Sequence, residues 1–365
     1  MRYYDVCIIG GGASGLAAAA SLSGALNVCI LEKSRPGRKI LASGGGRCNI
    51  TNVNADGFGD TVDFFRGLGL ELYEDEEGRC YPYSNRAEDV VDVLLADIEQ
   101  KNTDVITGFS ASEVSYGDGK FSVSDGRETV EAGRLIIATG GKSYPQMGTT
   151  GDGFKLAKQL GHRVSRVYPV LTPIECEDMP DFAGLRARGA LTLLKDGAPE
   201  AKSHGEIQFT KDGISGICAF DLTLHMGAEE GERPEEAMKR YQISIDFAPD
   251  FTREEVESRN SSFGIVTGRI AEAVAPEALK DFRLKVSGTK GWKNAQCTAG
   301  GVDLSQVNDV TCQSEIIPGL YFTGEVLDIQ FQCGGFNLQN AWSTGRRAAA
   351  HINESMGMID ADSQN

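Results

Sequence analysis

The chain has 365 residues, enough for two domains or for one large domain with an insertion, and 41% of them are apolar. Its formal net charge of −16 excludes a broad phosphate-backbone interface, which needs a surplus of Lys and Arg on one face. No apolar run reaches the roughly 18 residues that span a bilayer, and the nine cysteines lack the spacing of a disulfide framework or a zinc site.

These exclusions favour a reduced, cytoplasmic protein that acts on a small-molecule substrate and has no nucleic-acid or membrane partner. The Ala-rich stretch after Arg2 imitates a secretory signal, but Asp5 and the closely spaced Gly, Ala and Ser residues fit a strand, a turn and a helix better. The four histidines are scattered, so we expect no metal site. The oligomeric state stays open.

The first part of the chain alternates short apolar strands with helices. Residues 5–9 are predicted to form a buried parallel strand, 14–26 the helix after a glycine turn, and 27–31 a second strand. Residues 34–52 hold too many glycines and charges for regular structure throughout and are predicted to be a long functional loop or a loop with a helix. Further elements predicted here are a helix over 88–100, strands over 105–109, 113–116, 121–124 and 134–138, and a short helix over 153–161.

The pattern changes at about residue 164. Residues 191–194 and 206–210 have the character of antiparallel strands, Thr252 and Glu255 form a capping box that opens an acidic helix, and 268–279 is predicted to be another helix. A strand over 320–323 and a long helix that starts after Gly334-Gly335 restore the earlier pattern. We therefore expect residues 1–164 and 296–365 to form one domain, and 165–295 an inserted mixed β-barrel and helical domain for the substrate.

The first strand leads into the motif Gly10-x-Gly12-x-x-Gly15, and Glu32 ends the next strand. In a dinucleotide fingerprint the first glycine makes the tight turn, the second admits the pyrophosphate and the third lets helix and strand pack closely. The diphosphate lies on the helix N-terminus, and the acidic residue accepts hydrogen bonds from a ribose. The motif therefore predicts a bound dinucleotide.

FAD explains the remaining glycine-rich segments better than NAD does. Its ribityl chain and ring need contacts beyond the first βαβ unit, and candidates occur at residues 38–52, 138–141 and 324–338. Asp328 is placed to accept a hydrogen bond from a ribityl hydroxyl, and the helix after Gly334-Gly335 would direct its positive end at the pyrimidine edge of the ring. A dedicated NAD(P)H domain would need a second GxGxxG, which the sequence lacks. NAD(P)H is therefore expected only as a transient electron donor.

Several segments resemble the HI0933-like flavoproteins, a group that includes aminoacetone-oxidase-like NAD(P)/FAD-dependent oxidoreductases. They are IIGGGASGLAAA, GRKILASGGGRCNITN, LIIATGGKSYPQMGTTGDGFKLAKQLGH, GEIQFTKDGISG, CTAGGVDL and GLYFTGEVLD with GGFNLQNAWSTG. The resemblance implies an α/β fold, with a Rossmann-like FAD domain of glutathione-reductase type that an insert interrupts. It also implies a non-covalent FAD.

The resemblance assigns the cofactor to residues in all of these flavin-side segments. It implies FAD contacts for Gly10, Gly12, Gly15, Glu32, Lys33, Arg38, Lys39, Gly46, Arg47, Ala138, Gly324, Asp328, Gly335, Phe336, Asn337 and Leu338. The predicted site also includes Ala13, Ser14, Ser43, Gly44, Gly45, Asn49, Ala111, Thr139, Gly140, Glu325 and Gly334. No catalytic residue can be named.

Two departures from the family pattern concern the chemistry rather than the cofactor. Residues 329–333, Ile-Gln-Phe-Gln-Cys, stand where a shorter polar turn is expected, and the insert is short. Cys48 is more typical of a packed cysteine than of a redox thiol, since no CxxxxC partner exists.

The predicted function is an FAD-dependent oxidoreductase that moves electrons between a small organic substrate or NAD(P)H and an acceptor. Oxidase and reductase activity both stay open, as does the substrate. A non-oxidative FAD or nucleotide-binding protein, such as a flavin carrier or a thiazole-synthase-like enzyme, is the alternative.

Overall fold

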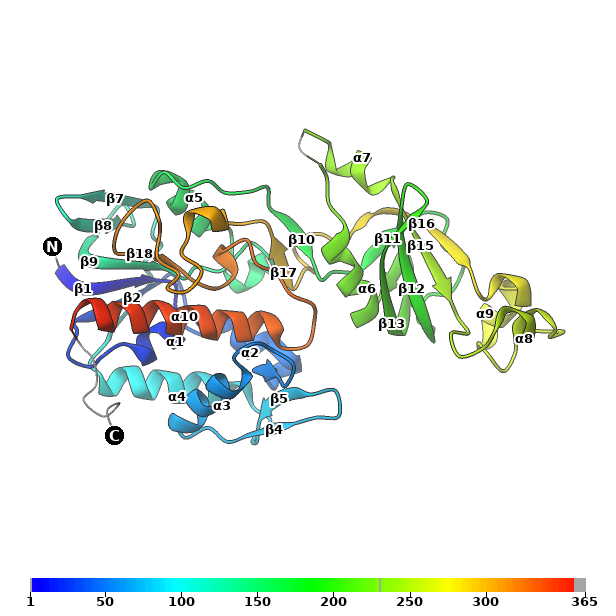
Figure 1. Cartoon of the computed structure of the whole chain (residues 1–365), viewed down its shortest axis with the longest axis horizontal. Helices are drawn as coiled ribbons and strands as arrows, with labels where there is room; N and C mark the ends of the chain where they lie inside the picture. Colours follow the sequence, from blue (N-terminus) through cyan, green and yellow to red (C-terminus); the bar gives the residue numbers. More distant parts are fainter. Residues whose placement is uncertain (1, 230, 358–365) are drawn as a thin grey trace. The chain divides into compact units, whose positions relative to one another are not determined.

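The computed structural model describes residues 2–229 and 231–357. The chain divides into two compact units, one made of Met1–Val167 with Thr298–Asn365 and the other of Tyr168–Cys297. The corresponding boundaries predicted from the sequence lie after residues 164 and 295. The chain leaves the first unit through strand β10 (Tyr168–Val170) and returns through β17 (Cys297–Ala299) (Figure 1).

The first unit is built on a seven-stranded sheet in the order β6-β2-β1-β9-β8-β7, with β18 paired to β9. Strands β1, β2, β6, β9 and β18 run parallel, and the hairpin of β7 and β8 adds antiparallel strands at one edge. The strands are β1 (Arg2–Ile9), β2 (Val28–Glu32), β6 (Asp104–Thr107), β7 (Glu113–Gly117), β8 (Lys120–Ser124), β9 (Thr129–Ile137) and β18 (Leu320–Phe322).

Alternate residues of the central strands enter two different cores. Val6 and Ile8 of β1 pack with helices α1 (Ala13–Ser21), α4 (Ala87–Gln100) and α10 (Phe336–Ser355) (Figure 1). Cys7 and Ile9 face the other way, toward a core that includes the hairpin and α5 (Asp152–Gln159). Because both faces are covered, the buried ends of these strands, such as residues 6–9 of β1 and 135–137 of β9, are continuous apolar runs.

Helix α1 is shorter than predicted, since it ends at Ser21 rather than near residue 26. Leu22 leaves the helix with extended backbone angles, and the Ser23-Gly24 pair that follows favours a turn over further helix. The predicted end near residue 26 rests only on the apolar, alanine-rich composition of this segment. The short helix lies against α10, where a Cβ on Gly345 would overlap the carbonyl oxygen of Ser14.

A small layer lies between β2 and α4 along the chain, and of its elements only a helix within residues 34–52 was among the predicted alternatives. It contains a three-stranded antiparallel sheet in the order β3-β5-β4 and two helices. Trp342 of α10 is fully buried against it, where its indole donates a hydrogen bond to the carbonyl oxygen of Ile50 at 2.9 Å. The elements are α2 (Arg38–Ala42), the 3₁₀ turn η1 (Ser43–Gly46), β3 (Thr51–Asn52), α3 (Phe58–Gly67), β4 (Leu72–Glu74) and β5 (Arg79–Pro82).

The second unit is a closed antiparallel barrel in the order β11-β14-β13-β12-β15-β16. Its core contains a group of packed aromatic rings, among them Phe182, Phe209 and Phe247. An inserted β-barrel with short helices in an α/β protein is the predicted fold class, which the structure confirms. Its strands are β11 (Ile174–Cys176), β12 (Arg186–Lys195), β13 (Ala198–Thr210), β14 (Gly213–Ser215), β15 (Tyr241–Asp246) and β16 (Phe282–Thr289).

The helices of the second unit test two local predictions. The capping box is confirmed, since Thr252 and Glu255 exchange hydrogen bonds at the start of α8 (Arg253–Glu257). The helix predicted over 268–279 is wrong in its length, because α9 (Gly268–Ala273) ends before Pro276, which opens a separate 3₁₀ turn. The remaining helices are α6 (Ile217–Leu222) and α7 (Pro234–Met238).

None of the nine cysteines forms a disulfide, and eight of them are buried, Cys333 being the exception. Within residues 2–229 and 231–357, no helix is both long enough and apolar enough to cross a membrane. The same residues contain no cluster of three or more His, Cys, Asp or Glu side chains that would hold a metal ion.

Candidate functional site

The first glycine turn joins β1 to α1 and is too crowded for side chains at two positions. Gly10 has a φ of +106°, and a Cβ there would lie 2.6 Å from the carbonyl oxygen of Ala138. A Cβ on Gly15 would overlap the carbonyl oxygen of Gly10, because helix and strand pack closely here. Both positions therefore require glycine for α1 to begin where it does.

Gly12 differs from these two glycines because the space beside it is open. It is the N-cap of α1, and a Cβ built on it meets nothing within 4 Å. The first turn of α1, which begins with Ala13 and Ser14, therefore presents backbone N–H groups and the positive end of the helix dipole to open space. A diphosphate requires this arrangement.

The Glu32 carboxylate at the end of β2 is held in place by two backbone N–H groups. Its Oε2 accepts a hydrogen bond from the Gly11 N–H at 2.8 Å, and its Oε1 accepts one from the Ser34 N–H at 2.8 Å. A carboxylate has about four acceptor sites, so it retains capacity for ribose hydroxyls. The Phe109 N–H donates to the Glu32 carbonyl at 3.2 Å, which brings the segment with Ala111 beside this end of the strand.

The second glycine cluster forms an exposed 3₁₀ turn after α2. Gly44 and Gly45 have left-handed backbone angles, and Gly46 has a φ of +85°. A Cβ on Gly45 or Gly46 would meet nothing within 4 Å, so this backbone is open to a ligand. Ser43 precedes the cluster, and its hydroxyl donates to the Ile40 carbonyl at 2.7 Å.

The four cations predicted around this loop all contact other parts of the protein. Lys33 forms an ion pair with Asp152 at 2.6 Å, and Lys39 forms one with Glu325 at 2.8 Å. Arg38 donates to the carbonyl oxygen of Gln146 at 2.9 Å. The Arg47 guanidinium lies 4.4 Å from the centre of the Tyr81 ring. These contacts orient the cations, and direct phosphate binding by each stays a prediction.

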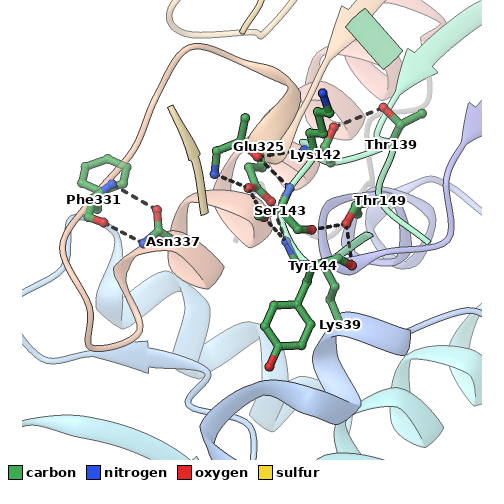
Figure 2. A network of polar contacts seen from close by, with 11 residues as sticks. Lys39, Thr139, Lys142, Ser143, Tyr144, Thr149, Glu325, Phe331 and Asn337 are labelled. Carbon is green, nitrogen blue, oxygen red and sulfur yellow. Dashed lines mark hydrogen bonds and ion pairs between the residues drawn. The ribbon is translucent and has the colours of Figure 1, made fainter. Parts of the chain in front are cut away.

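Glu325 brings the three predicted flavin-side segments together (Figure 2). Its Oε2 accepts from Lys39 Nζ, and its Oε1 accepts from the Ser143 hydroxyl at 2.9 Å. Lys39 also donates to the Ser143 hydroxyl at 3.0 Å. One carboxylate of the 3₁₀ turn η6 (Gly324–Val326) thus joins α2, which precedes the second glycine cluster, to the loop that follows β9.

Sequence reasoning missed two members of this network, Ser143 and Thr298. The backbone N–H of Thr298 donates to Glu325 Oε1 at 2.7 Å. Its hydroxyl accepts from the N–H groups of Lys142 and Ser143 at 2.8 and 3.0 Å. The motif CTAGGVDL contains Thr298, but no local pattern in it shows that the residue meets a loop more than 150 positions away.

The start of α10 is a second helix N-terminus at the site. Its N-cap, Gly335, has a φ of +104°, and a Cβ there would lie 2.7 Å from the Thr51 carbonyl oxygen and 2.9 Å from Asn49 Oδ1. Asn49 Oδ1 is buried and has no hydrogen-bond partner among the described residues. A buried acceptor without a partner is costly, so this atom fits a donor on a bound ligand.

Other predicted contacts lie around these two helix starts and already have protein partners. Asp328 accepts from the Ser165 hydroxyl at 2.6 Å and from the Gln330 amide at 2.7 Å. Asn337 binds the backbone of Phe331. The remaining predicted residues fall into three groups. Ala138, Thr139 and Gly140 follow β9, and Gly324 is the first residue of η6. Gly334, Phe336 and Leu338 lie at the start of α10. Their FAD contacts stay predictions.

Cys48 lies directly after the second glycine cluster but has the environment of a structural thiol. Its side chain is fully buried, and burial raises the pKa of the thiol to about 12, although Ser43 partly offsets this. The thiolate is the reactive form of cysteine. Cys48 therefore fits packing rather than redox chemistry.

Comparison with known families agrees with the geometry of the site. The HI0933-like protein Rossmann domain matches residues 57–351, and an FAD binding domain matches residues 5–94. The glycine turn, the Glu32 carboxylate and the unpartnered Asn49 oxygen fit the same group. The cofactor is FAD.

Two characterised relatives align over nearly the whole chain. The 3-dehydro-bile acid delta(4,6)-reductase of Clostridium scindens is 32% identical over 409 aligned positions, which cover 94% of this chain and 98% of the relative. The ribosomal RNA dihydrouridine synthase of Escherichia coli is 27% identical, and the alignment covers 96% of this chain and 98% of the relative. Each alignment is longer than this chain, so both relatives carry additional residues.

Solved structures with the same fold include two that act on 3-ketosteroids. The 3-ketosteroid delta1-dehydrogenase of Sterolibacterium denitrificans has a TM-score of 0.56 at 13% identity, with coverage of 97% of this chain and 100% of the other. The 3-ketosteroid-delta4-(5alpha)-dehydrogenase of Rhodococcus jostii has a TM-score of 0.53 at 14% identity, with coverage of 96% and 97%. At these identities the likeness concerns the fold alone.

Proposed function

The chain belongs to the HI0933-like family and is an FAD-dependent oxidoreductase, and we propose that it is a reductase of a conjugated carbon–carbon double bond in a small ring compound. NAD(P)H is the electron donor in this proposal. The ring compound gains two electrons and two protons, while NAD(P)H and one proton supply them and leave NAD(P)⁺.

The observation that carries the proposal is the shared chemistry of the two relatives. One is a reductase of a 3-dehydro-bile acid, and the other makes dihydrouridine, in which a pyrimidine ring is saturated. Their substrates differ greatly in size and charge, but both names describe reduction of an unsaturated ring. A redox function is therefore better supported than the non-oxidative alternative.

The residues of this chain bind and orient the cofactor in the proposal. Bound FAD supplies the two-electron chemistry. The N-terminus of α1 at Gly12 would hold the diphosphate, the Glu32 carboxylate would hold the adenosine ribose, and the positive end of α10 would stabilise negative charge on the reduced flavin. Lys39 places a fixed positive charge at the same site, because Glu325 and Ser143 hold its ammonium group.

Charge favours a small substrate over ribosomal RNA. The net charge of −16 repels a phosphate backbone, and an RNA-binding surface needs clustered Lys and Arg residues. We therefore choose an unsaturated ketone, such as a steroid-like ring, as the substrate class.

The test is anaerobic reduction of the FAD-loaded protein followed by addition of candidate acceptors. NADH or NADPH should bleach the flavin absorbance, and a 3-keto-4-ene steroid should restore it and gain two hydrogens, as measured by mass spectrometry. A uridine-containing RNA oligomer should restore it far more slowly. The proposal fails if dithionite bleaches the flavin but no unsaturated ketone restores it, or if small amines reduce the flavin and oxygen then yields peroxide.

A further inference from the structure

A groove of about 480 Å³ runs along one side of helix α10, outside the glycine turns and the Glu325 network. The helix residues that line it recur every three or four positions, so they form one stripe. The opposite wall comes from the residues that lead into α3 and from its first turn. The lining residues are Ala55, Asp56, Gly57, Asp60, Phe331, Phe336, Gln339, Asn340, Ser343, Arg346, Arg347 and Ala350.

One end of the groove carries two phenylalanines. Phe336 is the first residue of α10, and Phe331 belongs to the unusual segment 329–333. Phe331 is 39% exposed, yet its backbone is held on both sides, since its N–H donates to Asn337 Oδ1 at 3.0 Å and its carbonyl accepts from Asn337 Nδ2 at 2.8 Å (Figure 2). These two bonds fix the backbone that carries the exposed ring of Phe331, and an exposed aromatic ring at this end suits contact with a planar ligand.

The other end carries two arginines, Arg346 and Arg347. Arg346 Nη1 donates to the Asp60 carbonyl oxygen at 2.8 Å, and its guanidinium lies 4.9 Å from the centre of the Phe64 ring. Arg347 Nη1 donates to the Asp309 carbonyl oxygen at 2.6 Å. Within the described part of the chain, neither guanidinium has a carboxylate at ion-pair distance. Each carries five N–H donors, so each is oriented and still able to bind an anion.

The groove lining also includes four polar residues, Asp56, Asp60, Asn340 and Ser343, of which Asp60 lies beside Arg346. Carboxylates in dinucleotide sites accept hydrogen bonds from ribose hydroxyls. From Phe336 to Arg347 the axis of α10 rises by about 16 Å at 1.5 Å per residue. The groove therefore offers an aromatic contact, hydroxyl acceptors and an anion site along an extended line.

We propose that this groove binds an extended nicotinamide dinucleotide, with the nicotinamide end at Phe331 and Phe336 and the phosphates at Arg346 and Arg347. The proposal rests on the proposed function, which needs such a donor and has no second GxGxxG to hold it. It also fits the direction of α10, because the phenylalanine end lies where that helix begins, beside the predicted place of the flavin ring.

The test is equilibrium binding to the FAD-loaded protein, measured by calorimetry with oxidised NADP⁺, oxidised NAD⁺ and ADP, so that no turnover occurs. Arg347→Gln should raise the Kd of all three about ten-fold, as expected for loss of one charged hydrogen-bonding partner. Phe331→Ala should raise the Kd of the dinucleotides about five-fold and leave that of ADP unchanged. Arg186→Gln, an exposed arginine of β12, is the matched control and should change nothing.

FAD content and thermal unfolding of each variant show whether it is folded. The inference is overturned if wild type binds none of the three ligands at millimolar concentration, or if both groove variants bind all three as wild type does. Reoxidation of the dithionite-reduced protein by an unsaturated ketone separates the two proposals. If it persists while the groove variants have no effect on binding, the groove assignment is wrong and the reductase proposal stands.

Discussion

The two glycine clusters of the cofactor site need glycine for different reasons. In the first cluster, Gly10 and Gly15 face other atoms of the protein so closely that a Cβ would collide with a carbonyl oxygen. In the second cluster, Gly45 and Gly46 face open space and need glycine for their φ angles of +66° and +85°. Gly15 is therefore a packing requirement, whereas Gly45 and Gly46 are backbone requirements on an exposed loop. Substitutions should therefore separate folding from cofactor binding.

The largest effect should come from Gly15→Ala. The added methyl group would overlap the Gly10 carbonyl oxygen, so α1 must shift away from β1. We expect a loss of about 3 kcal/mol in the free energy of unfolding, the upper part of the range for overpacking. Urea unfolding and the ratio of flavin to protein absorbance would measure it. A variant with wild-type stability and full FAD content would show that the packing of α1 does not depend on this glycine.

Glu325→Gln should produce the next largest effect, because Glu325 joins the second cluster to the rest of the site. The amide keeps the shape of the carboxylate but loses the charge that binds Lys39 and half of its acceptor capacity. Hydrogen bonds to charged groups are worth roughly 1.5–3 kcal/mol, so we expect a loss of about 2 kcal/mol on urea unfolding.

The matched control for Glu325 is Glu131→Gln, which removes an ion pair with Lys120 in which the lysine side chain is 43% exposed. Exposed pairs contribute about 0–1 kcal/mol, so this variant should stay close to wild type. Equal losses in the two variants would contradict the view that the Glu325 network positions the second cluster.

Gly12→Ala tests the open position of the first cluster. Its backbone angles, φ −85° and ψ −167°, suit alanine, and a Cβ there meets no other atom within 4 Å. The apoprotein should therefore keep its stability to within about 0.5 kcal/mol. The methyl group would occupy the place of the diphosphate, so the Kd for FAD should rise about ten-fold, or ~1.4 kcal/mol. Fluorescence titration of apoprotein with FAD measures this, and an unchanged Kd would mean that the diphosphate lies elsewhere.

Gly45→Ala should lower the free energy of unfolding less than Gly15→Ala or Glu325→Gln does. Alanine in the left-handed region costs about 1 kcal/mol, and part of that strain can relax because the loop is exposed. Gly45→Asn is the matched control, since asparagine tolerates this region better and should lose about half as much. If both variants unfold like wild type while Gly15→Ala does not, packing alone distinguishes the clusters.

Local patterns in the sequence predicted the parts of the fold that depend on neighbouring residues. The glycine turn, the Thr252 capping box and the start of α10 belong to this group, and each needs only a few adjacent positions. The prediction that this helix reaches residue 26 was wrong, because it followed the apolar composition of the segment and gave too little weight to the turn-forming Ser23-Gly24 pair. The order of the strands in the closed barrel of the second unit could not be predicted, because it depends on pairs between strands that are far apart in the sequence.

The site was predicted less completely than the fold, because its chemistry depends on contacts between distant segments. Lys39 was expected to face the cofactor, and the structure pairs it with Glu325, 286 positions away. Thr298 and Ser143 carry no motif that marks them as partners of this carboxylate. An ion pair between residues so far apart cannot be predicted from one sequence. A glycine that has no room for a Cβ can be predicted, because it belongs to a local motif such as Gly10-x-Gly12-x-x-Gly15.

The smallest predicted effect concerns Cys48, which follows the second cluster but belongs to the core. Burial raises the pKa of its thiol to about 12 from the usual 9.0, so the thiol stays protonated at pH 8. Iodoacetamide should therefore leave Cys48 unmodified in the native protein at pH 8 and react first at Cys333, the one cysteine that is not buried. Peptide mass spectrometry locates the label, and unfolding in urea should make all nine cysteines reactive. Labelling of native Cys48 as fast as Cys333 would mean that the second cluster opens to solvent, and the contrast between an exposed loop and the packed core beneath it would fail.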